Sequence, residues 1–415
     1  MRAGRDERPA LPPFAILPVL ALALAKLALD LPFAHRYGWH RDEVYYLASG
    51  NHLQLGYVDY PPLTPLLSRL EEQIVGTSLT GQRAAPALTG AVLVILAALI
   101  ARELGGGRLA QVLAALLSLA SPMFLGANLL MQTVSFDSDG LRLSGVLHEP
   151  PGAGKHPAFL LLHGFGGTRN GTGNLMAADL LTSLGYAALR FDFRGCGESE
   201  GERAFILCQD QVQDTRNAIS YLQSLPGIDP ERIGVLGASF GAAVAVYTGG
   251  VDERIGAVIS LGGWGNGERK FRAQHATPEA WARFEAMLAE GRRQHERGER
   301  MMVPRYDIVP IPEQLRHLRA PGGHDEFPWD TAQSMYDFRA DDVVGNIAPR
   351  PLLLVHASHD SVTPTRESIE LFVRAGQPAE LHLFDDMNHF TGAEKGSRVG
   401  DLVTGWLDCY FPNPR

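Results

Sequence analysis

Three residues in the C-terminal part of the chain have the types and the order needed for nucleophilic attack on a carbonyl carbon. Ser239 lies in the run GASFG at residues 237–241, between an apolar stretch and a series of small residues. A GxSxG pattern in this setting places a serine on a sharp strand-to-helix turn with its hydroxyl exposed. Asp360 and then His389 follow along the chain, each after another apolar stretch. The sequence therefore predicts Ser239 as nucleophile, His389 as general base and Asp360 as the acid that orients the base.

Other acids and histidines compete for these roles. Asp385 and Asp386 are closer to His389 in the sequence. A residue so near in a loop does not readily reach one ring nitrogen of the histidine while the other nitrogen meets the serine. His356 and His359 are alternative bases, but they belong to the predicted loop of the acid itself. We therefore keep the serine, acid and base named above.

A glycine-rich segment, HGFGG at residues 163–167, follows an earlier apolar stretch. Glycines allow backbone amides to approach a ligand oxygen closely, so the N–H groups of Phe165 and Phe240 are expected to form an oxyanion hole. A single donor of this kind contributes about 3 to 4 kcal/mol to transition-state stabilisation. The DFRG run at 192–195 is expected to fix a loop. Cys196 is expected to pack rather than react, since no other histidine is placed to activate it.

The elements that would position these residues are short apolar runs separated by helical stretches. Continuous apolar strands alternating with helices imply a mainly parallel sheet covered on both faces, which is the α/β class. Two alternating runs around an Asp-Gly pair predict an opening hairpin over residues 133–136 and 141–147. The apolar runs occupy residues 158–162, 187–191, 233–236, 255–260, 351–355 and 381–384.

An inserted cap is predicted over residues 263–350, because the connection between two of these runs is far longer than the usual 2 to 6 residues or so. A helix should begin at Thr277-Pro278, with the threonine as N-cap and the proline at the first helical position. Its apolar stripe is expected to dock the cap. Phe327 and Trp329, in an aromatic stretch broken by proline, are the candidate substrate contacts.

In this order, HGFGG, DFRG and GASFG resemble the α/β-hydrolase superfamily, most closely esterases such as cinnamoyl esterases and peptidases of the prolyl-oligopeptidase type. The resemblance covers about residues 132–412. It implies an α/β-hydrolase fold with a helical cap and cleavage of carboxylic esters, small or aryl, through an acyl-enzyme. A serine peptidase or aminopeptidase is the alternative. The resemblance implies a small-molecule ester substrate and no metal or organic cofactor.

Composition excludes other classes of function. The net charge of −9 comes from dispersed acids and bases, with no basic stripe for nucleic acid and no polybasic patch. Three cysteines without metal-ligand spacing suggest neither a disulfide framework nor a zinc site. A chain of 415 residues is longer than most single domains, so two units are expected, at 1–130 and 131–415.

The first 130 residues contain hydrophobic runs of the length that crosses a bilayer core of about 30 Å. Residues 84–101 and 109–136 carry no charge and predict two transmembrane helices. Residues 11–31 form a weaker third, because they include Lys26 and Asp30. We therefore expect membrane association through this segment. A cytoplasmic protein with these helices in a buried bundle is the alternative.

This segment carries further motifs, HRDEVYY at 40–46, GYVDYPPL at 56–63 and ARELGGG at 101–107. They resemble the start of membrane glycosyltransferases of the dolichyl-phosphate-mannose mannosyltransferase and aminoarabinose transferase type, over about residues 10–130. In that family an acidic residue matching Asp42 or Glu43 serves the transfer reaction. Such enzymes have many more spans, so we expect a truncated remnant that anchors the hydrolase. An inactive membrane scaffold and a glycosyltransferase are the remaining alternatives.

Overall fold

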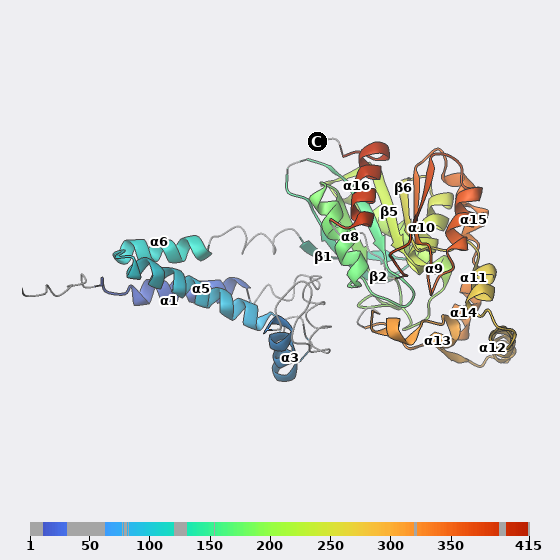
Figure 1. Cartoon of the computed structure of the whole chain (residues 1–415), viewed down its shortest axis with the longest axis horizontal. Coiled ribbons are helices and arrows are strands. Elements are labelled where there is room, and N and C mark those ends of the chain that lie inside the picture. The colour runs from blue at the N-terminus through green and yellow to red at the C-terminus, as the bar shows by residue number, and fades with distance from the viewer. Residues whose placement is uncertain are drawn as a thin grey trace, which may run out of the picture. The chain divides into compact units, whose positions relative to one another are not determined.

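The computed structural model of the chain has two compact units, Met1–Gln132 and Thr133–Arg415 (Figure 1). The acids Asp42 and Glu43 and the motif around them lie outside the described residues, as does most of the motif at 56–63. The structure describes residues 11–30, 63–76, 78, 81, 83–119, 131–152, 154–318, 322–389 and 396–413.

The second unit is built on one eight-stranded sheet in the order β1-β2-β4-β3-β5-β6-β9-β10. β2 pairs with β4 in antiparallel fashion, and every neighbouring pair from β4 to β10 is parallel. All six predicted apolar runs are strands of this sheet, which confirms the mainly parallel architecture. The strands are β1 (Met131–Ser138), β2 (Leu141–His148), β3 (His156–Leu162), β4 (Ala187–Phe191), β5 (Ile228–Ala238), β6 (Ile255–Leu261), β9 (Leu352–Ala357) and β10 (Ala379–Phe384).

Helices cover both faces of this sheet. α8 (Thr172–Ser183) and α16 (Arg398–Tyr410) pack on one face, and α9 (Cys208–Ser224), α10 (Phe240–Val251) and α15 (Arg366–Arg374) on the other (Figure 1). Successive strand residues point to opposite faces, so each of β3, β4, β5, β6, β9 and β10 supplies both hydrophobic cores, whereas β1 and β2 supply only the one that includes Phe136. Burying one Val, Leu, Ile or Phe contributes about 1.5–3 kcal/mol, so these two layers supply the main stabilisation.

The predicted opening hairpin is present as β1 and β2. Its two-residue turn has positive φ at both positions, 53° at Asp139 and 83° at Gly140, which is the geometry of a type I′ turn. Phe136 of β1 is buried and stacks on Tyr221 of α9 with ring centroids 5.2 Å apart. The expectation of one transmembrane helix over residues 109–136 is therefore wrong, since its last residues are a strand of the sheet.

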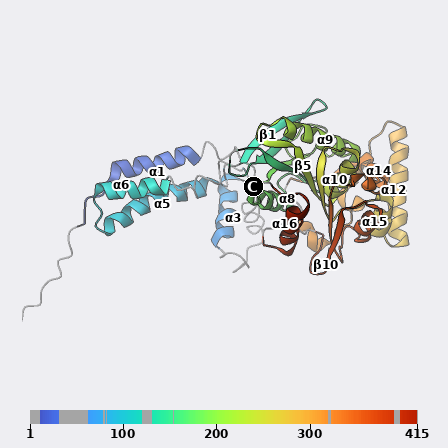
Figure 2. The same cartoon turned by 90° about the horizontal axis from the view of Figure 1, so that it is seen from above.

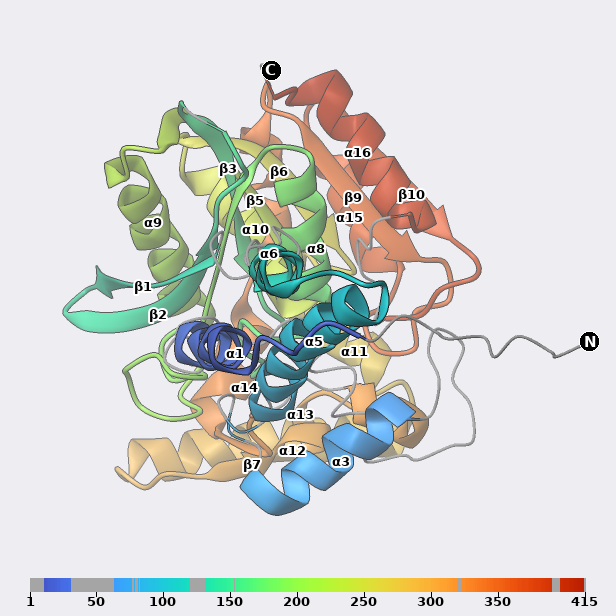
Figure 3. The same cartoon turned by 90° about the vertical axis from the view of Figure 1, so that its left-hand side faces the viewer.

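The cap inserted between β6 and β9 gathers at one end of the sheet (Figures 1 and 3). Its longest helix, α12 (Pro278–Glu296), begins where predicted, and Thr277 Oγ1 accepts a hydrogen bond from the Ala280 amide. This helix lies beside α14 (Trp329–Asp337; Figure 2). Phe284 and Leu288 of its stripe are buried, which confirms the docking role. The elements are α11 (Gly267–Gln274), α12 (Pro278–Glu296), β7 (Met302–Pro304), α13 (Arg305–Ile308), β8 (Glu326–Pro328) and α14 (Trp329–Asp337), with 3-10 turns at Glu313–Leu318, Ala340–Asp342 and Val344–Ile347.

A lysine is buried at the base of the cap, on α11. Lys270 Nζ lies 3.7 Å from the ring centroid of Phe271 and 5.2 Å from that of Trp264. No described residue lies within hydrogen-bond distance of this amine. Burial lowers the pKa of Lys270 to about 7, against smaller opposing effects of Glu367 and Cys208. The position is therefore costly for a charged amine at neutral pH.

We expect the free energy of unfolding to rise with pH because of Lys270. Between about pH 7 and the unfolded-state pKa near 10.4, the unfolded chain binds a proton that the folded chain has lost, so higher pH favours folding. From pH 7 to 9 this amounts to about 2 kcal/mol. In denaturant titrations Lys270→Met should remove this rise, whereas Arg272→Met, at an exposed site on the same helix, should keep it. An unchanged rise in Lys270→Met would contradict the expectation.

The first unit contains α1 (Ile16–Asp30), α3 (Leu63–Val75), α5 (Ala84–Glu103) and α6 (Arg108–Leu119). α1, α5 and α6 pack around small side chains, while large apolar side chains face outward. This distribution is the reverse of the one in a water-soluble bundle. The buried apolar residues are Ala15, Val19, Ala23, Ala87, Ala91, Val94, Ala98 and Ala115, and the exposed ones include Leu17, Leu24, Leu88, Ile100, Leu109 and Leu117.

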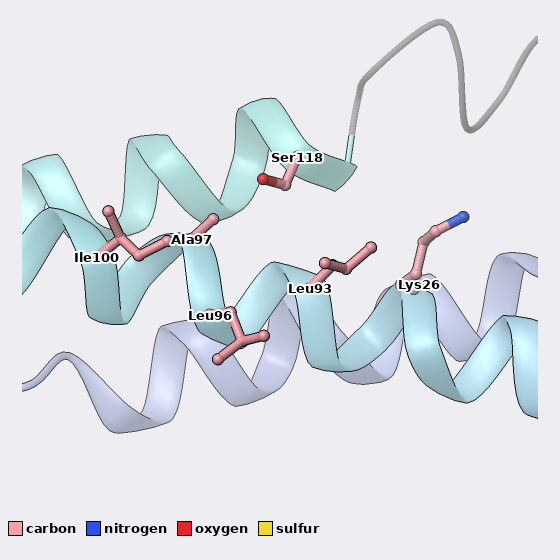
Figure 4. Close-up of a pocket in the computed structure, with 7 residues that line it drawn as sticks. Lys26, Leu93, Leu96, Ala97, Ile100 and Ser118 are labelled. Carbon is pink, nitrogen blue, oxygen red and sulfur yellow. The ribbon is translucent and has the colours of Figure 1, made fainter. Parts of the chain in front are cut away.

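Polar groups inside this helical unit satisfy one another. The side chain of Gln111 accepts a hydrogen bond from the Ala15 amide at 2.8 Å and donates to the carbonyl of Gly106 at 3.0 Å. Lys26 pairs with Asp30 one turn later, at 2.8 Å. Lys26 also lines a pocket of about 270 Å³ together with Ser118 and four apolar side chains of α5 (Figure 4).

The lengths of these helices correct the predicted spans. Within the described residues, only α5 is long and apolar enough to cross a membrane, over Pro86–Glu103. At 1.5 Å per residue, α1 measures about 22 Å and α6 about 18 Å, less than a bilayer core. The described part of the chain therefore has one helix of spanning length where two to three were expected.

Candidate active site

Ser239 stands at the turn between β5 and α10 in a strained backbone conformation, with φ 56° and ψ −114°. Such a conformation costs on the order of 1–3 kcal/mol and persists only where the surroundings impose it. Here a Cβ on Gly237 would lie 2.1 Å from the Gly241 carbonyl oxygen, and one on Gly241 would lie 2.3 Å from that of Leu162. Both glycines are therefore needed for the turn that presents the serine hydroxyl.

The structure brings Ser239, His389 and Asp360 together in one line of hydrogen bonds. His389 Nε2 lies 2.8 Å from Ser239 Oγ, and His389 Nδ1 lies 2.8 Å from Asp360 Oδ2. These residues follow β5, β10 and β9, whose carboxyl ends meet at one edge of the parallel sheet. The side chains of His389 and Asp360 are 3% and 1% exposed. A histidine held in this way can accept the hydroxyl proton while its other nitrogen donates to the acid.

Asp360 is bonded through both carboxylate oxygens. Oδ1 accepts hydrogen bonds from the amides of Val362 and Thr363 at 2.7 and 2.8 Å. Burial acts to raise the pKa of Asp360, but hydrogen bonds from His356 and His389 outweigh it, so the pKa lies well below its ordinary value. The carboxylate is therefore ionised throughout the neutral range.

His356 also belongs to the site, although it was weighed from its position in the sequence only as an alternative base. It is buried at the end of β9, and its Nε2 lies 3.2 Å from Asp360 Oδ2 and 3.1 Å from the Thr363 carbonyl oxygen. Its Nδ1 lies 2.6 Å from Ser368 Oγ. The ring therefore sits behind the acid, where it holds Asp360 and cannot serve as the base. The one sequence feature that could have indicated this contact is its position four residues before Asp360.

The competing residues lie elsewhere. Asp385 and Asp386 are 86% and 52% exposed and pair with Arg398. His359 is exposed. Of the acids and histidines weighed from the sequence, His389 is the one that contacts Ser239, and Asp360 is the acid that contacts His389.

The HGFGG segment lies between β3 and α8, next to Ser239. A Cβ on Gly164 would stand 3.6 Å from the Ser239 Cβ. No described residue accepts a hydrogen bond from the amide of Phe165 or of Phe240. The two phenylalanine rings contact each other, with centroids 5.9 Å apart. Two amides close to the serine are thus available to an external oxygen atom.

Buried polar residues support this segment from behind. His163 Nε2 accepts a hydrogen bond from the Phe193 amide at 3.2 Å, and its Nδ1 lies 2.9 Å from the Gly164 carbonyl oxygen. Burial lowers the pKa of His163, which keeps the ring neutral in this arrangement. Asp192, which is also buried, forms an ion pair with Arg169. Burial raises the pKa of the Cys196 thiol, so the reactive thiolate is disfavoured. The DFRG run and Cys196 therefore have the supporting and packing roles expected of them.

The two aromatic residues proposed as substrate contacts are covered by protein. Phe327 is 0% exposed and stacks on the ring of Phe165 at a centroid distance of 4.3 Å. Trp329 packs on α12, where a Cβ on Gly291 would lie 2.0 Å from its ring. The expectation of substrate contact is not met, because their apolar surfaces are used in packing the cap. Within the described residues, no group of His, Cys, Asp or Glu is arranged to hold a metal ion.

Comparison with known proteins assigns this unit to a family. A family model described as serine aminopeptidase, S33, matches residues 154–396, which is more than half of the chain and includes Ser239, Asp360 and His389. The chain belongs to the S33 serine aminopeptidase family. The S33 match lies wholly within the second unit, so it gives no support to the glycosyltransferase resemblance of the first 130 residues, which stays a prediction.

The chain is also similar to individual proteins. Thiohydrolase aneE of Aspergillus aculeatus is 28% identical over 294 residues, covering 65% of this chain and 88% of that protein. Quorum-quenching protein AidA of Acinetobacter baumannii is 40% identical over 129 residues, or 31% of this chain and 42% of that protein. The solved structure of the alpha/beta hydrolase GrgF from Penicillium sp. sh18 matches with a TM-score of 0.55 at 22% identity, over 67% of this chain and 96% of that one. The second unit therefore has the α/β-hydrolase fold.

Proposed function

We propose that this chain is a serine hydrolase that cleaves carboxylic esters through an acyl-enzyme. The observation that carries the proposal is the continuous hydrogen-bonded line from Asp360 through His389 to Ser239, with both contacts at 2.8 Å. Membership of a hydrolase family supports it. An inactive scaffold would have no need to keep a strained serine and two buried partners in this arrangement.

In the proposed mechanism, Ser239 Oγ attacks the carbonyl carbon and His389 Nε2 takes the hydroxyl proton. Asp360 stabilises the resulting imidazolium, and the amides of Phe165 and Phe240 donate to the oxyanion. His389 then gives the proton to the leaving alkoxide, which departs as the alcohol. In the second half, His389 removes a proton from water, whose oxygen attacks the acyl carbon of the acyl-enzyme. The bond between that carbon and Ser239 Oγ then breaks, and His389 returns the proton to Oγ as the carboxylic acid leaves.

A peptidase acting through the same residues is the second candidate, and the description of the matching family favours it. The name of the relative aneE adds thioesters to the acyl compounds worth testing. The experiment is hydrolysis of nitrophenyl esters of increasing acyl length beside aminoacyl nitroanilides, using the full chain in detergent. Much faster ester cleavage is expected. Comparable rates on the anilides would favour the peptidase, and no turnover of any substrate would refute the proposal.

We also propose that the first unit attaches the hydrolase to a membrane. Its support is the outward-facing leucine and isoleucine side chains around an interior of alanines and two valines, together with one helix of spanning length. The internal bonding of Gln111 and of Lys26 with Asp30 lowers the cost of placing these groups in hydrocarbon. In water, the exposed apolar surface would be unfavourable.

A truncated chain of residues 131–415 should therefore be soluble and retain most of the esterase activity of the full chain. It contains the whole sheet, both hydrophobic cores and all the residues of the candidate site. The full chain should float with liposomes in a density gradient, while the truncated chain should stay in the aqueous fraction. A truncated chain that is folded by circular dichroism yet inactive would show that the first 130 residues contribute to the site.

A further inference from the structure

A short part of the cap reaches the segment that carries the Phe165 amide. Arg305, the first residue of α13, is buried. One amino group of its guanidinium donates a hydrogen bond to the Phe165 carbonyl oxygen, and the other donates to the His324 carbonyl oxygen at 3.1 Å. The Arg305 amide also bonds to the carbonyl of Asp325, at 2.7 Å. Arg305 thus joins the HGFGG segment to two parts of the cap.

Aromatic contacts reinforce this link. The Arg305 guanidinium carbon lies 5.0 Å from the ring centroid of Phe165 and 5.7 Å from that of Phe327. These two rings stack on each other at 4.3 Å, and Phe165 in turn contacts the ring of Phe240. The side chains of both residues with available amides therefore belong to one packed group that includes the cap.

The approach of the cap is close enough to require a glycine. Gly166 has φ +51°, and a Cβ there would lie 2.5 Å from the ring of Phe327 and 2.9 Å from a guanidinium nitrogen of Arg305. His324 adds a second attachment, since its ring nitrogen lies 2.9 Å from the Gly195 carbonyl oxygen in the loop after β4. The clamp, defined here as Arg305, His324 and Phe327, thus rests on the oxyanion segment without intervening space.

We propose that Arg305 is a positioning residue, through which the cap holds the Phe165 amide in the orientation that the oxyanion requires. Hydrogen bonds from an ionised donor are about twice as strong as neutral ones, and the planar guanidinium fixes two carbonyls at once. On the other side of Phe165, the Gly167 amide bonds to the Gly164 carbonyl at 3.0 Å. Phe165 is therefore restrained on both sides, through the peptide group that carries its amide and through the one that carries its carbonyl. This inference rests on the proposed serine hydrolase mechanism and gives the cap a part in the chemistry.

The test compares Arg305→Ala with the wild type, in the full chain. Ester kcat should fall by about 100-fold, the lower end of the loss seen when an oxyanion donor is removed, with KM changed by less than about three-fold. The rate of labelling by a fluorophosphonate should fall in parallel, since phosphonylation develops the same oxyanion charge. Arg300→Ala removes a neighbouring exposed arginine that pairs with Glu202 and should leave kcat unchanged.

Two further measurements separate positioning from a general effect on stability. Addition of guanidinium chloride at millimolar concentration should restore part of the kcat of Arg305→Ala, and Arg305→Lys should fall between the alanine variant and the wild type. A wild-type kcat in Arg305→Ala would overturn the inference, as would a loss of activity that only follows a loss of folded protein. If Arg305→Ala does not fold, Phe327→Leu replaces it, with an expected loss in kcat of about ten-fold. Unchanged kcat in that variant would equally overturn it.

Failure of this inference can be told apart from failure of the proposed function. If the wild-type chain neither cleaves esters, thioesters or anilides nor reacts with the fluorophosphonate, the mechanism itself is wrong. If the wild type is active and Arg305→Ala is folded and equally active, only the positioning role is wrong.

Discussion

Ser239→Ala should lower ester turnover by about a million-fold and abolish covalent labelling by a fluorophosphonate. Loss of a serine nucleophile has an effect of this size in other hydrolases, where the residual rate comes from the oxyanion hole and binding alone. The fold should persist, because the flanking glycines and the surrounding packing impose the backbone turn. Active-site titration and far-ultraviolet circular dichroism measure the two parts of this expectation.

The matched control is Ser224→Ala, which removes an exposed hydroxyl at the end of α9 that bonds to the Tyr221 carbonyl. It should be labelled and turn over esters as the wild type does. Labelling of Ser239→Ala at the wild-type rate would mean that another residue is the nucleophile.

Asp360→Asn should lower kcat by roughly four decades, the effect of neutralising the acid in a comparable triad. An amide in place of Oδ2 cannot accept the hydrogen bonds that His389 Nδ1 and His356 Nε2 make to that oxygen, so the base loses its orientation. The remaining carbonyl oxygen of Asn can still accept from the amides of Val362 and Thr363, so the loop should keep its shape.

Asp386→Asn provides the control for this variant, because its carboxylate is exposed and pairs with Arg398. It should retain wild-type kcat. A loss of several decades in Asp386→Asn, together with a healthy Asp360→Asn, would reverse the assignment of the acid.

The positions of the serine and of the strands could be predicted because their causes are local. The turn at Ser239 needs glycines on either side of it, and such steric needs leave a mark within a few residues. Strands buried on both faces are continuous apolar runs, so β3, β4, β5, β6 and β9 were evident from the sequence. The edge strand β10 is only partly buried, and a short run at 381–384 indicated it.

The clamp and His356 could not be predicted in the same way. Arg305 meets the Phe165 carbonyl across 140 positions of the chain, and nothing in the sequence around either residue indicates the contact. The role of His356 depends on how the loop after β9 folds back, because only then does Asp360 come within 3.2 Å of the His356 ring. The aromatic rings of Phe327 and Trp329 looked suited to substrate, but composition does not distinguish a ring that lines a site from one that packs a cap.

The uncharged run at 109–136 shows another limit of predicting structure from the sequence. A lack of charge is common to membrane helices and to strands that bury one face, so it predicted a single long helix. The described part of this run instead contains α6, which ends at Leu119, and β1, which begins at Met131.

The place where the chain enters the sheet also decides how the enzyme would respond to mechanical load. β1 directly follows the first unit and forms one edge of the sheet, while the strands that precede Asp360 and His389 lie at and next to the opposite edge. Tension from a membrane-held first unit would therefore act on the hydrogen bonds between β1 and β2 before any others. Peeling of this hairpin would leave β3, β5, β9 and β10 in place, so the tether could be pulled without disturbing the alignment of serine, histidine and acid.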